Sequence, residues 1–521
     1  MSFFNTKRLL LFVPIAMATL LQACGGGGGY GGSPAPVAVI TDINGAATAS
    51  GSGGSGFIVD GSAFGTLSGT GTTSGYSVDF RNGTNNSIMA SASYAGSGWT
   101  STYIKAVVPS SGLTVGTTYK VTVTTPAGTS NGVNFTLTNS VALSPSTLAW
   151  GSTAALPAAI QGFPSAVAPI SITSGSTTTT TDHIYTFGGN TAASGTLNGR
   201  AANTAAVYSN TINDGTNGTV AGALSASSWA TEANPLPAGR GFAAGALANG
   251  LNSMVSGSGA VYVIGGLDPS GAATSTVYYA PLGSTGAVGV WATTTALPQP
   301  RYALGAAVFR GHLYVAGGND GTDTPTATVY SAPINSDGSL GAWSTTLPSL
   351  PIPLAYHQIV ITGGVLYVLG GTSTAGIDPT SNAQSVGTVS TIYYNSINPD
   401  GTLTGASWTT NPGSLIKAVE KNTVVAIGSD ILASGGLYNG ASSSSTEESY
   451  STQSTTDASL SSFQGATGSK TISGTTGGYN FFDHSVALYV DPMGGPHVMI
   501  LGGQTVGTLL PTVETGVWFS Q

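Results

Sequence analysis

Two arginines and two histidines in this sequence have side chains suited to binding a polar ligand. His357 and His484 stand at the start of two apolar segments, within YHQIVI and DHSVAL. Arg240 and Arg301 lie near the same point of two similar segments, GRGFAAGAL and PRYALGAAV. Guanidinium groups carry a positive charge, imidazole groups can bind a proton, and both donate hydrogen bonds. These four residues therefore form a candidate ligand-binding set. The alternative is that they make ordinary polar contacts at the ends of strands.

The other three histidines recur at one position of a repeated pattern. His183, His312 and His497 each lie five residues before the first glycine of a Gly-Gly pair. This regularity indicates a turn or sheet-edge position, so we predict no metal site and no catalytic residue among them. The segment Asn319–Asp323 has oxygen ligands of the kind that calcium takes, but its composition is also that of a turn, which is the preferred interpretation. No cofactor is predicted.

The composition limits the class of protein. The chain has 521 residues, of which 40% are hydrophobic and only 6% are charged, and its formal net charge is −8. The apolar content is enough for packed cores, whereas the acidic balance disfavours nucleic acid as a partner. A polybasic membrane patch is disfavoured for the same reason. We therefore expect at least two folded domains without nucleic-acid contacts.

The amino terminus has the pattern of an export signal. The basic residues Lys7 and Arg8 precede an apolar run over 9–21, which is too short to span a membrane as a helix. This run ends in Leu21-Gln22-Ala23-Cys24, which resembles the lipobox of bacterial lipoproteins. The resemblance implies that residues 1–23 are a signal peptide and that Cys24 is lipidated.

Cys24 is the single cysteine of the sequence, so the exported domains are expected to hold together without an internal disulfide. The resemblance implies a membrane partner, bound through the acyl groups on this residue, such as palmitate. Gly25 at the second mature position implies the outer membrane of the cell envelope, and both its periplasmic and its surface face stay open. Residues 24–36 are rich in glycine and are predicted to be a flexible tether.

Residues 37–140 are predicted to form an all-β domain. Val121 and Val123 alternate with threonines, and turn-forming residues follow at 125–128. The matching segments are IVDGSAFG at 58–65, VDF at 78–80, VVP at 107–109 and YKVTVTTPAGTSNGVNF at 119–135. They resemble the IPT/TIG domain, an immunoglobulin-like β-sandwich that serves as a spacer or interaction module.

Residues 141–521 contain a repeat of about 50 residues. Six apolar segments precede Gly-Gly pairs, at 184–187, 261–264, 313–316, 366–369, 431–434 and 498–501. A tyrosine follows in five units, at positions 208, 278, 330, 393 and 450, and a tryptophan in four, at 229, 291, 343 and 408. A Leu-Pro pair closes three of the units, at 236–237, 297–298 and 347–348. Each unit resembles the kelch repeat, in which four antiparallel strands form one blade of a β-propeller.

The number of repeats predicts how the ring closes. The last unit has one strand after Gly503, whereas residues 145–156 look like an outer strand without a Gly-Gly pair before it. We therefore predict that 145–156 pairs with 511–519. The expected fold is all-β: an immunoglobulin-like sandwich followed by a six-bladed kelch-like propeller that its own N-terminal strand closes.

The kelch resemblance also bears on function. It implies that Arg240, Arg301, His357 and His484 lie near the mouth of the central channel, where propellers bind ligands. The chain is then a lipid-anchored envelope protein whose propeller binds a glycan or a protein without catalysis. The alternative is a carbohydrate-active enzyme resembling a mutarotase or a sialidase, although sialidases hold their substrate with three arginines. A copper oxidase of the kelch type needs a cysteine that this chain does not offer.

Overall fold

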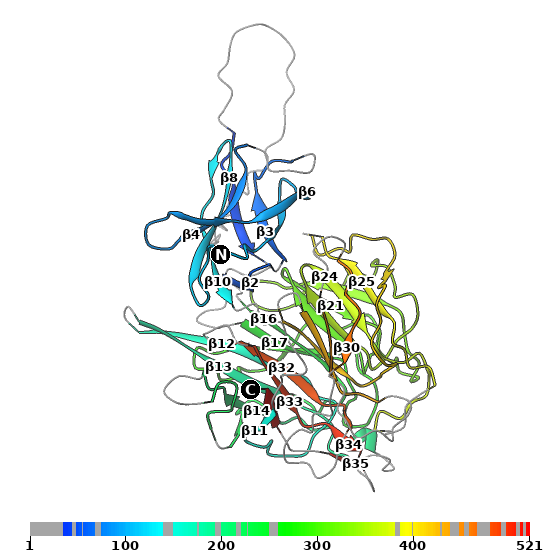
Figure 1. The fold of residues 1–521 in the computed structure, drawn as a ribbon. Helices are drawn as coiled ribbons and strands as arrows, with labels where there is room; N and C mark the ends of the chain where they lie inside the picture. Colours follow the sequence, from blue (N-terminus) through cyan, green and yellow to red (C-terminus); the bar gives the residue numbers. More distant parts are fainter. Residues whose placement is uncertain are drawn as a thin grey trace, which may run out of the picture. The chain divides into compact units, whose positions relative to one another are not determined.

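We describe a computed structural model of the chain, in which almost all regular structure is β (Figure 1). The structure describes residues 35–43, 48–54, 56–67, 74–138, 150–174, 177–192, 199–214, 220–226, 228–249, 259–380, 386–398, 400–427, 430–437, 448–452, 458–465, 480–490, 496–506, 511–513 and 517–520. These residues contain no α-helix and one short 3-10 turn, Gly199–Ala201. No helix among them is long and apolar enough to cross a membrane.

The predicted signal peptide, Cys24 and most of the tether fall in residues 1–34, outside the described part of the chain. Those predictions are therefore not tested by the structure.

Two sheets contain the strands of residues 39–138. The first has the order β1-β3-β7-β6 and the second β2-β10-β8-β4-β5, with β9 paired to β8. Their bounds are β1 Val39–Ile43, β2 Thr48–Ser52, β3 Gly56–Ser62, β4 Ser77–Asn82, β5 Ile88–Ser91, β6 Ser93–Trp99, β7 Tyr103–Val107, β8 Thr118–Thr125, β9 Gly128–Thr129 and β10 Val133–Thr138. The alternating valines of β8 are buried, as their period of two predicts.

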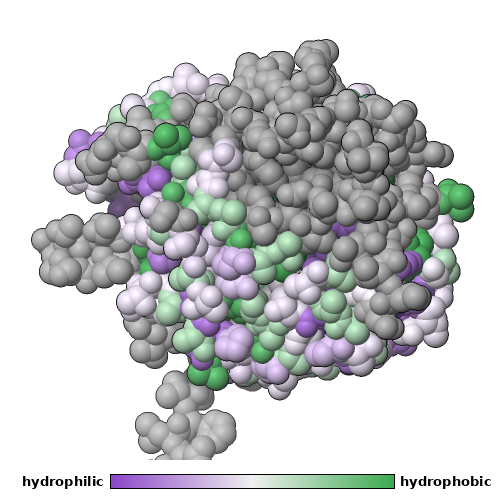
Figure 2. All heavy atoms as spheres, turned by 90° about the horizontal axis from the view of Figure 1, so that it is seen from below, coloured by the Kyte–Doolittle hydropathy of each residue, from purple (hydrophilic) through white to green (hydrophobic). Residues whose placement is uncertain are grey.

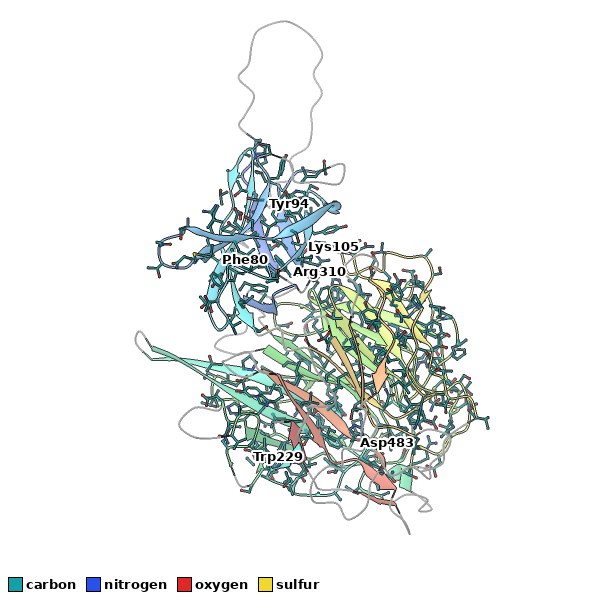
Figure 3. All side chains as sticks on the ribbon, in the orientation of Figure 1. Phe80, Tyr94, Lys105, Trp229, Arg310 and Asp483 are labelled. Carbon is teal, nitrogen blue, oxygen red and sulfur yellow. The ribbon has the colours of Figure 1, made fainter. Side chains whose placement is uncertain are left out.

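Aromatic rings fill the core of residues 39–138. Phe80, labelled in Figure 3, meets Phe135 edge to face with ring centroids 5.2 Å apart, and both are fully buried. Trp99 is also buried, and its indole N–H donates to the Phe64 carbonyl at 2.9 Å. The aromatic area buried here supplies much of the stability of this part of the chain.

Seven antiparallel sheets follow in the described part of residues 150–520, and six of them are each built around one Gly-Gly repeat. The first three contain β12 Ser165–Ser174, β13 Thr177–Phe187, β14 Val207–Thr211 and β15 Ala230–Thr231; β16 Ala244–Asn249, β17 Gly259–Ile264, β18 Val277–Leu282 and β19 Ala292–Thr293; and β20 Gly305–Phe309, β21 His312–Ala316 and β22 Val329–Pro333. The fourth and fifth contain β23 Gln358–Thr362, β24 Val365–Leu369, β25 Ile392–Ser396 and β26 Thr409–Thr410; and β27 Thr423–Ile427, β28 Asp430–Ser434, β29 Glu448–Thr452 and β30 Gln464–Gly465. The sixth has the order β11-β36-β33-β32, with β11 Trp150–Ser152, β32 Ser485–Val490, β33 Pro496–Leu501 and β36 Val517–Ser520.

In each of these six sheets a Gly-Gly pair follows directly after the strand that pairs with the first strand: β13, β17, β21, β24, β28 or β33. In β17 and β24 every residue is buried, which explains why these strands are continuously apolar rather than alternating. Both glycines of each pair have positive φ, for example 61° at Gly265 and 89° at Gly266. A Cβ atom at Gly265 would lie 2.4 Å from the carbonyl oxygen of Arg301, so a side chain does not fit there.

The repeated tryptophans tie each unit to the one before it. Four indole N–H groups donate to backbone carbonyls at 2.9–3.0 Å: Trp229 to Ala154, Trp291 to Asn234, Trp343 to Thr295 and Trp408 to Pro348. The acceptors lie in or next to the Leu-Pro segments of the preceding unit. These hydrogen bonds give the four tryptophans a structural role, and Figure 3 labels Trp229 among them.

One of these contacts gives a direct test. We expect Trp291→Phe to lower the free energy of unfolding by about 2 kcal/mol, because it leaves the Asn234 carbonyl without its donor and opens a void. The hydrogen bond of Trp343 is exposed, so Trp343→Phe should cost less than half as much. Chemical denaturation of the two variants measures the difference, and equal losses would contradict the assigned role.

The two ends of this region pair with each other. β11 is antiparallel to β36, with Trp150 opposite Ser520 and Ser152 opposite Trp518. β11 lies in the predicted segment 145–156, and β36 overlaps the predicted segment 511–519 and extends one residue past it. Residues 511–513 differ from the prediction, because they form β35 and pair with β34 (Gln504–Val506), which also pairs with β31 (Asn480–Phe482).

The first strands of the six sheets also contact one another in sequence. β12 contacts β16, which contacts β20, and the series continues through β23 and β27 to β32, which contacts β12. The contacts therefore form a closed cycle among the described residues. The visible face in Figure 2 mixes hydrophilic and hydrophobic residues without a single large patch of either kind on its described atoms.

Candidate functional site

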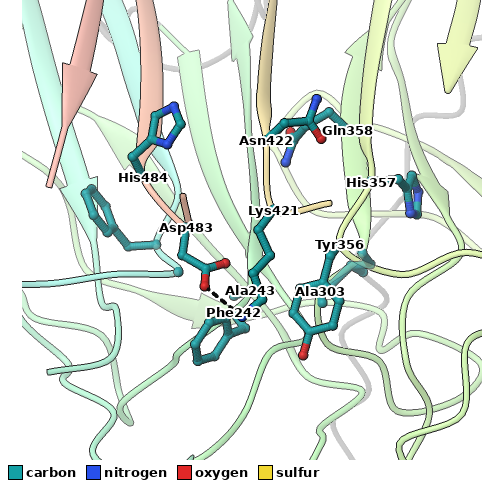
Figure 4. Close-up of a pocket in the computed structure, with 13 residues that line it drawn as sticks. Phe242, Ala243, Ala303, Tyr356, His357, Gln358, Lys421, Asn422, Asp483 and His484 are labelled. Atoms are coloured by element: carbon teal, nitrogen blue, oxygen red, sulfur yellow. Dashed lines mark ion pairs between the residues drawn. The ribbon is translucent and has the colours of Figure 1, made fainter. Parts of the chain in front are cut away.

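One pocket is lined by residues from all six of these sheets. Its volume is about 90 Å³, and each sheet contributes residues at or just before the start of its first strand (Figure 4). The side chains that matter below are Phe242, Tyr356, Lys421, Asn422 and Asp483, with His357 and His484 beside them. The polar side chains of the pocket thus stand at the starts of the apolar first strands, where residues of all six sheets come together.

Six residues at equivalent positions form what we call the central collar: Gly162, Phe242, Ala303, Tyr356, Lys421 and Asp483. Their φ angles lie between 52° and 58°. Each amide N–H donates to the carbonyl of the equivalent residue in the preceding sheet, at 2.6–3.1 Å, and Gly162 donates to Asp483. The collar is therefore a closed cycle of main-chain hydrogen bonds.

The backbone of the collar is strained at five of its six positions. A residue with a side chain pays roughly 1 kcal/mol or more for positive φ, which glycine does not. The shared hydrogen-bond pattern holds all six in this conformation. Sequence patterns give little sign of such a bend, because glycine occupies it only at Gly162.

A buried ion pair joins two neighbouring positions of the collar. Lys421 Nζ lies 3.1 Å from Asp483 Oδ2, and the two side chains are 0% and 5% exposed. The same ammonium donates to the Pro379 carbonyl at 2.7 Å and lies 5.2 Å from the centre of the Tyr356 ring. Figure 4 shows the two charged groups pointing toward each other. The ammonium is therefore surrounded by a carboxylate, a carbonyl oxygen and an aromatic ring.

The pocket has an acidic character as well as a basic one. Burial raises the pKa of Asp483 to about 6, although Lys421 opposes this, and the neighbouring Glu420 carboxyl adds to the rise. Glu420 is fully buried. The Asp483 carboxyl therefore lines the pocket close to the Lys421 ammonium, and the buried Glu420 carboxyl acts on it from outside the lining.

A second polar group adjoins the collar through Tyr356. The Tyr302 ring meets the Tyr356 ring edge to face at 6.3 Å, and its hydroxyl donates to Asp323 Oδ1 at 2.9 Å. Asp323 also accepts two hydrogen bonds from Arg200, at 2.7 and 2.8 Å, and the guanidinium lies over the Tyr302 ring. Arg200 and Asp323 come from loops of the first and third sheets, so this bidentate pair links sheets that are not neighbours in sequence.

The two predicted histidines lie at the pocket, but in the spaces between sheets. His357 and His484 are 1% and 4% exposed, and their positions are equivalent to those of Phe163 and Leu304. His484 Nε2 lies 2.6 Å from Thr423 Oγ1. Burial lowers the pKa of His357 to about 4 and that of His484 to about 3, so both are neutral at pH 7.

This burial predicts sensitivity to acid. Between pH 6.5 and 4 the unfolded chain takes up a proton on His357 that the folded chain does not, so the free energy of unfolding falls as the pH is lowered. Both proteins lose stability as the pH is lowered from 7 to 4. We expect the free energy of unfolding of His357→Leu to fall by about 3 kcal/mol less than that of the unmodified chain. Denaturation curves at both pH values measure this, with His312→Leu at the start of β21 as the control. Parallel losses in all three proteins would contradict it.

The two predicted arginines do not line the pocket. Arg240 Nη2 donates to the Tyr278 hydroxyl at 2.9 Å and its guanidinium lies over that ring, while Arg301 Nη2 donates to Thr328 Oγ1 at 3.2 Å. Both side chains are buried within the sheets. The structure thus brings the two histidines to the pocket and turns the two arginines away from it.

The residues that sequence reasoning missed are those of the collar itself. Lys421 and Asp483 each lie just before the apolar first strand of a sheet, next to Asn422 and His484. In a chain with 6% charged residues, a lysine and an aspartate at one repeat position were a usable signal. Aligning the six segments at this position would have brought them together.

The remaining histidines and the possible calcium segment have structural roles. A Cβ atom on Gly286, Gly401 or Gly222 would lie within 3 Å of the ring of His183, His312 or His497, respectively, so each ring packs against a turn glycine. Asp320 Oδ1 accepts hydrogen bonds from Thr322 and Thr324 within its own turn. In the part of the chain that the structure describes, no three histidine, cysteine or acidic residues are grouped so as to hold a metal ion.

Comparison of the sequence with models of known protein families gave no match, and comparison with curated proteins gave none.

Proposed function

We propose that the six sheets are the blades of a kelch-like β-propeller, closed by β11, and that residues 37–140 form an immunoglobulin-like sandwich of the IPT/TIG type. The closed cycle of contacts among the first strands and the pairing of β11 with β36 support the propeller. The central collar supports six equivalent units, because each sheet contributes one residue to it. The two sheets and shared aromatic core of residues 39–138 support the sandwich.

We propose that the protein is a lipid-anchored component of the bacterial cell envelope, on either face of the outer membrane, that binds a glycan or a protein partner. The observation that carries the binding function is the pocket at the collar, where six sheets meet around buried polar and aromatic side chains. Lys421 is fixed by Asp483 and by the Pro379 carbonyl before any ligand arrives. Such preorganised side chains favour binding, because little ordering is needed when the ligand enters. The lipobox carries the proposed anchor.

The anchor and the binding site are tested separately. Metabolic labelling with a fatty acid should mark the unmodified chain and place it in the membrane fraction, whereas Cys24→Ala should lose the label and become soluble. Soluble Cys24→Ala protein is then offered to immobilised glycans and to envelope protein extracts. Binding that Tyr356→Ala weakens at least tenfold, and Tyr279→Ala does not, supports the collar pocket. Labelling that survives Cys24→Ala contradicts the anchor alone.

One observation favours a second candidate function, a carbohydrate-active enzyme. Asp483 has a pKa raised to about 6 and lies near Glu420, and paired carboxyl groups carry acid–base chemistry on sugars. Turnover of a saccharide that disappears in Asp483→Asn, but persists in Asp378→Asn, would establish the enzyme. Binding without turnover supports the binding module.

A further inference from the structure

We propose that the central pocket binds the ring of an uncharged sugar, at the end or branch of a glycan, and discriminates against acidic sugars. This inference rests on the proposed binding function and narrows it to one ligand class. It is carried by the charges, the aromatic rings and an amide group that line the pocket.

The charges of the pocket disfavour an anion. Among the described residues that line it, Lys421 is the one cationic side chain, and Asp483, the Pro379 carbonyl and the Tyr356 ring already contact the ammonium. The Glu420 carboxyl acts on Asp483 from nearby. A uronate or sialate carboxylate would have to displace Asp483 from its lysine and leave an uncompensated carboxyl group in a buried site.

The arginines that would hold a carboxylate are occupied. Arg240 and Arg301 point into the sheets, where Tyr278 and Thr328 accept their hydrogen bonds. Arg200, whose guanidinium lies over the Tyr302 ring, donates hydrogen bonds from Nη1 and Nη2 to Asp323. No arginine of the described residues lines the pocket, so these residues offer no guanidinium fork for an acidic sugar.

The remaining groups suit a neutral sugar. Phe242 and Tyr356 line the pocket with aromatic rings, against which the C–H faces of a pyranose pack. Asn422 is 1% exposed, and neither its amide oxygen nor its amide nitrogen has a hydrogen-bond partner among the described residues. Buried amides are nearly always partnered, and a sugar hydroxyl both donates and accepts, so it would satisfy this group.

The size of the pocket limits the ligand to about one ring. Its volume of about 90 Å³ corresponds to roughly six to nine water-sized probes. That space takes a single sugar unit, and the rest of a glycan would extend out of the pocket. We therefore expect recognition of a terminal or branching residue.

The experiment compares matched neutral and acidic glycans on the full chain with Cys24→Ala. Calorimetry or a glycan array is run with glucose-, galactose- and mannose-terminated tetrasaccharides, and with the same cores terminated by glucuronate, galacturonate or sialate. We expect at least one neutral glycan to bind, and its acidic counterpart to bind at least tenfold more weakly. Phe242→Leu should weaken the neutral ligand about tenfold, whereas Phe309→Leu, at the far end of β20, should not.

The outcomes separate this inference from the binding function. Acidic glycans that bind as tightly as neutral ones overturn the inference and leave a glycan-binding module. Binding of an envelope protein with no glycan bound overturns the inference and leaves a protein-binding module. No binding of either kind contradicts both. The comparison of neutral with acidic ligands uses one unmodified pocket, so it does not depend on the folding of any pocket variant.

Discussion

Replacing Lys421 with methionine is expected to lower the free energy of unfolding by about 3–5 kcal/mol at pH 8. The methionine keeps most of the volume but leaves the buried Asp483 carboxyl without its ammonium partner. Because the folded pKa of Asp483 lies above its ordinary value, its carboxylate form costs stability as the pH rises through about 6. The loss should therefore be larger at pH 8 than at pH 5, where the carboxyl takes up a proton.

The control for this prediction removes both charges. Lys421→Met combined with Asp483→Asn should recover most of the stability, because no unpaired charge is left in the pocket. Chemical denaturation at pH 5 and pH 8 measures the three proteins. A single variant as stable as the unmodified chain at pH 8 would mean that Lys421 and Asp483 are not paired in solution.

Deleting residues 150–157 should destabilise the chain by more than about 5 kcal/mol. This change removes the partner strand of β36 and the buried Leu156. It also removes the Ala154 carbonyl that accepts from Trp229 and the Thr153 hydroxyl that accepts from the Leu224 amide. Loss of a buried leucine alone costs about 2–5 kcal/mol, so the strand and the two hydrogen bonds account for the rest.

Leu156→Ala is the matched control, since it removes the core contribution and leaves the backbone of β11 in place. Thermal unfolding followed by circular dichroism compares the two proteins. We expect the midpoint of the shortened chain to fall well below that of Leu156→Ala. Equal midpoints would show that pairing between the two ends contributes nothing to stability.

The repeated elements of the fold were predictable because each has a local cause. Continuous apolar runs such as 261–264 predict strands buried on both faces, and the structure buries β17 completely. The glycines that follow have positive φ, as their type indicates. The pairing of β11 with β36 came from counting strands. The pairing of 511–513 with β34 did not, because nothing local marks it.

The candidate site was only partly predictable, for a geometric reason. The bend at each collar residue changes the direction of the side chains on either side of it. Arg240, before the bend, points into its sheet, whereas His357, after the bend, lies between sheets beside the pocket. Neither arginine nor histidine type reveals this difference. Long-range main-chain hydrogen bonds between units create the bend, and no window of sequence contains them.

The collar has a consequence for the proposed binding function. Its closed hydrogen-bond cycle uses only amide and carbonyl groups, so the six side chains are free to differ, and here they are as unlike as glycine, phenylalanine, lysine and aspartate. The main-chain atoms of these six residues thus close the cycle, whereas the proposed ligand contacts come from their side chains. Substitutions in the collar can therefore leave the main-chain cycle intact, provided that paired side chains such as Lys421 and Asp483 change together.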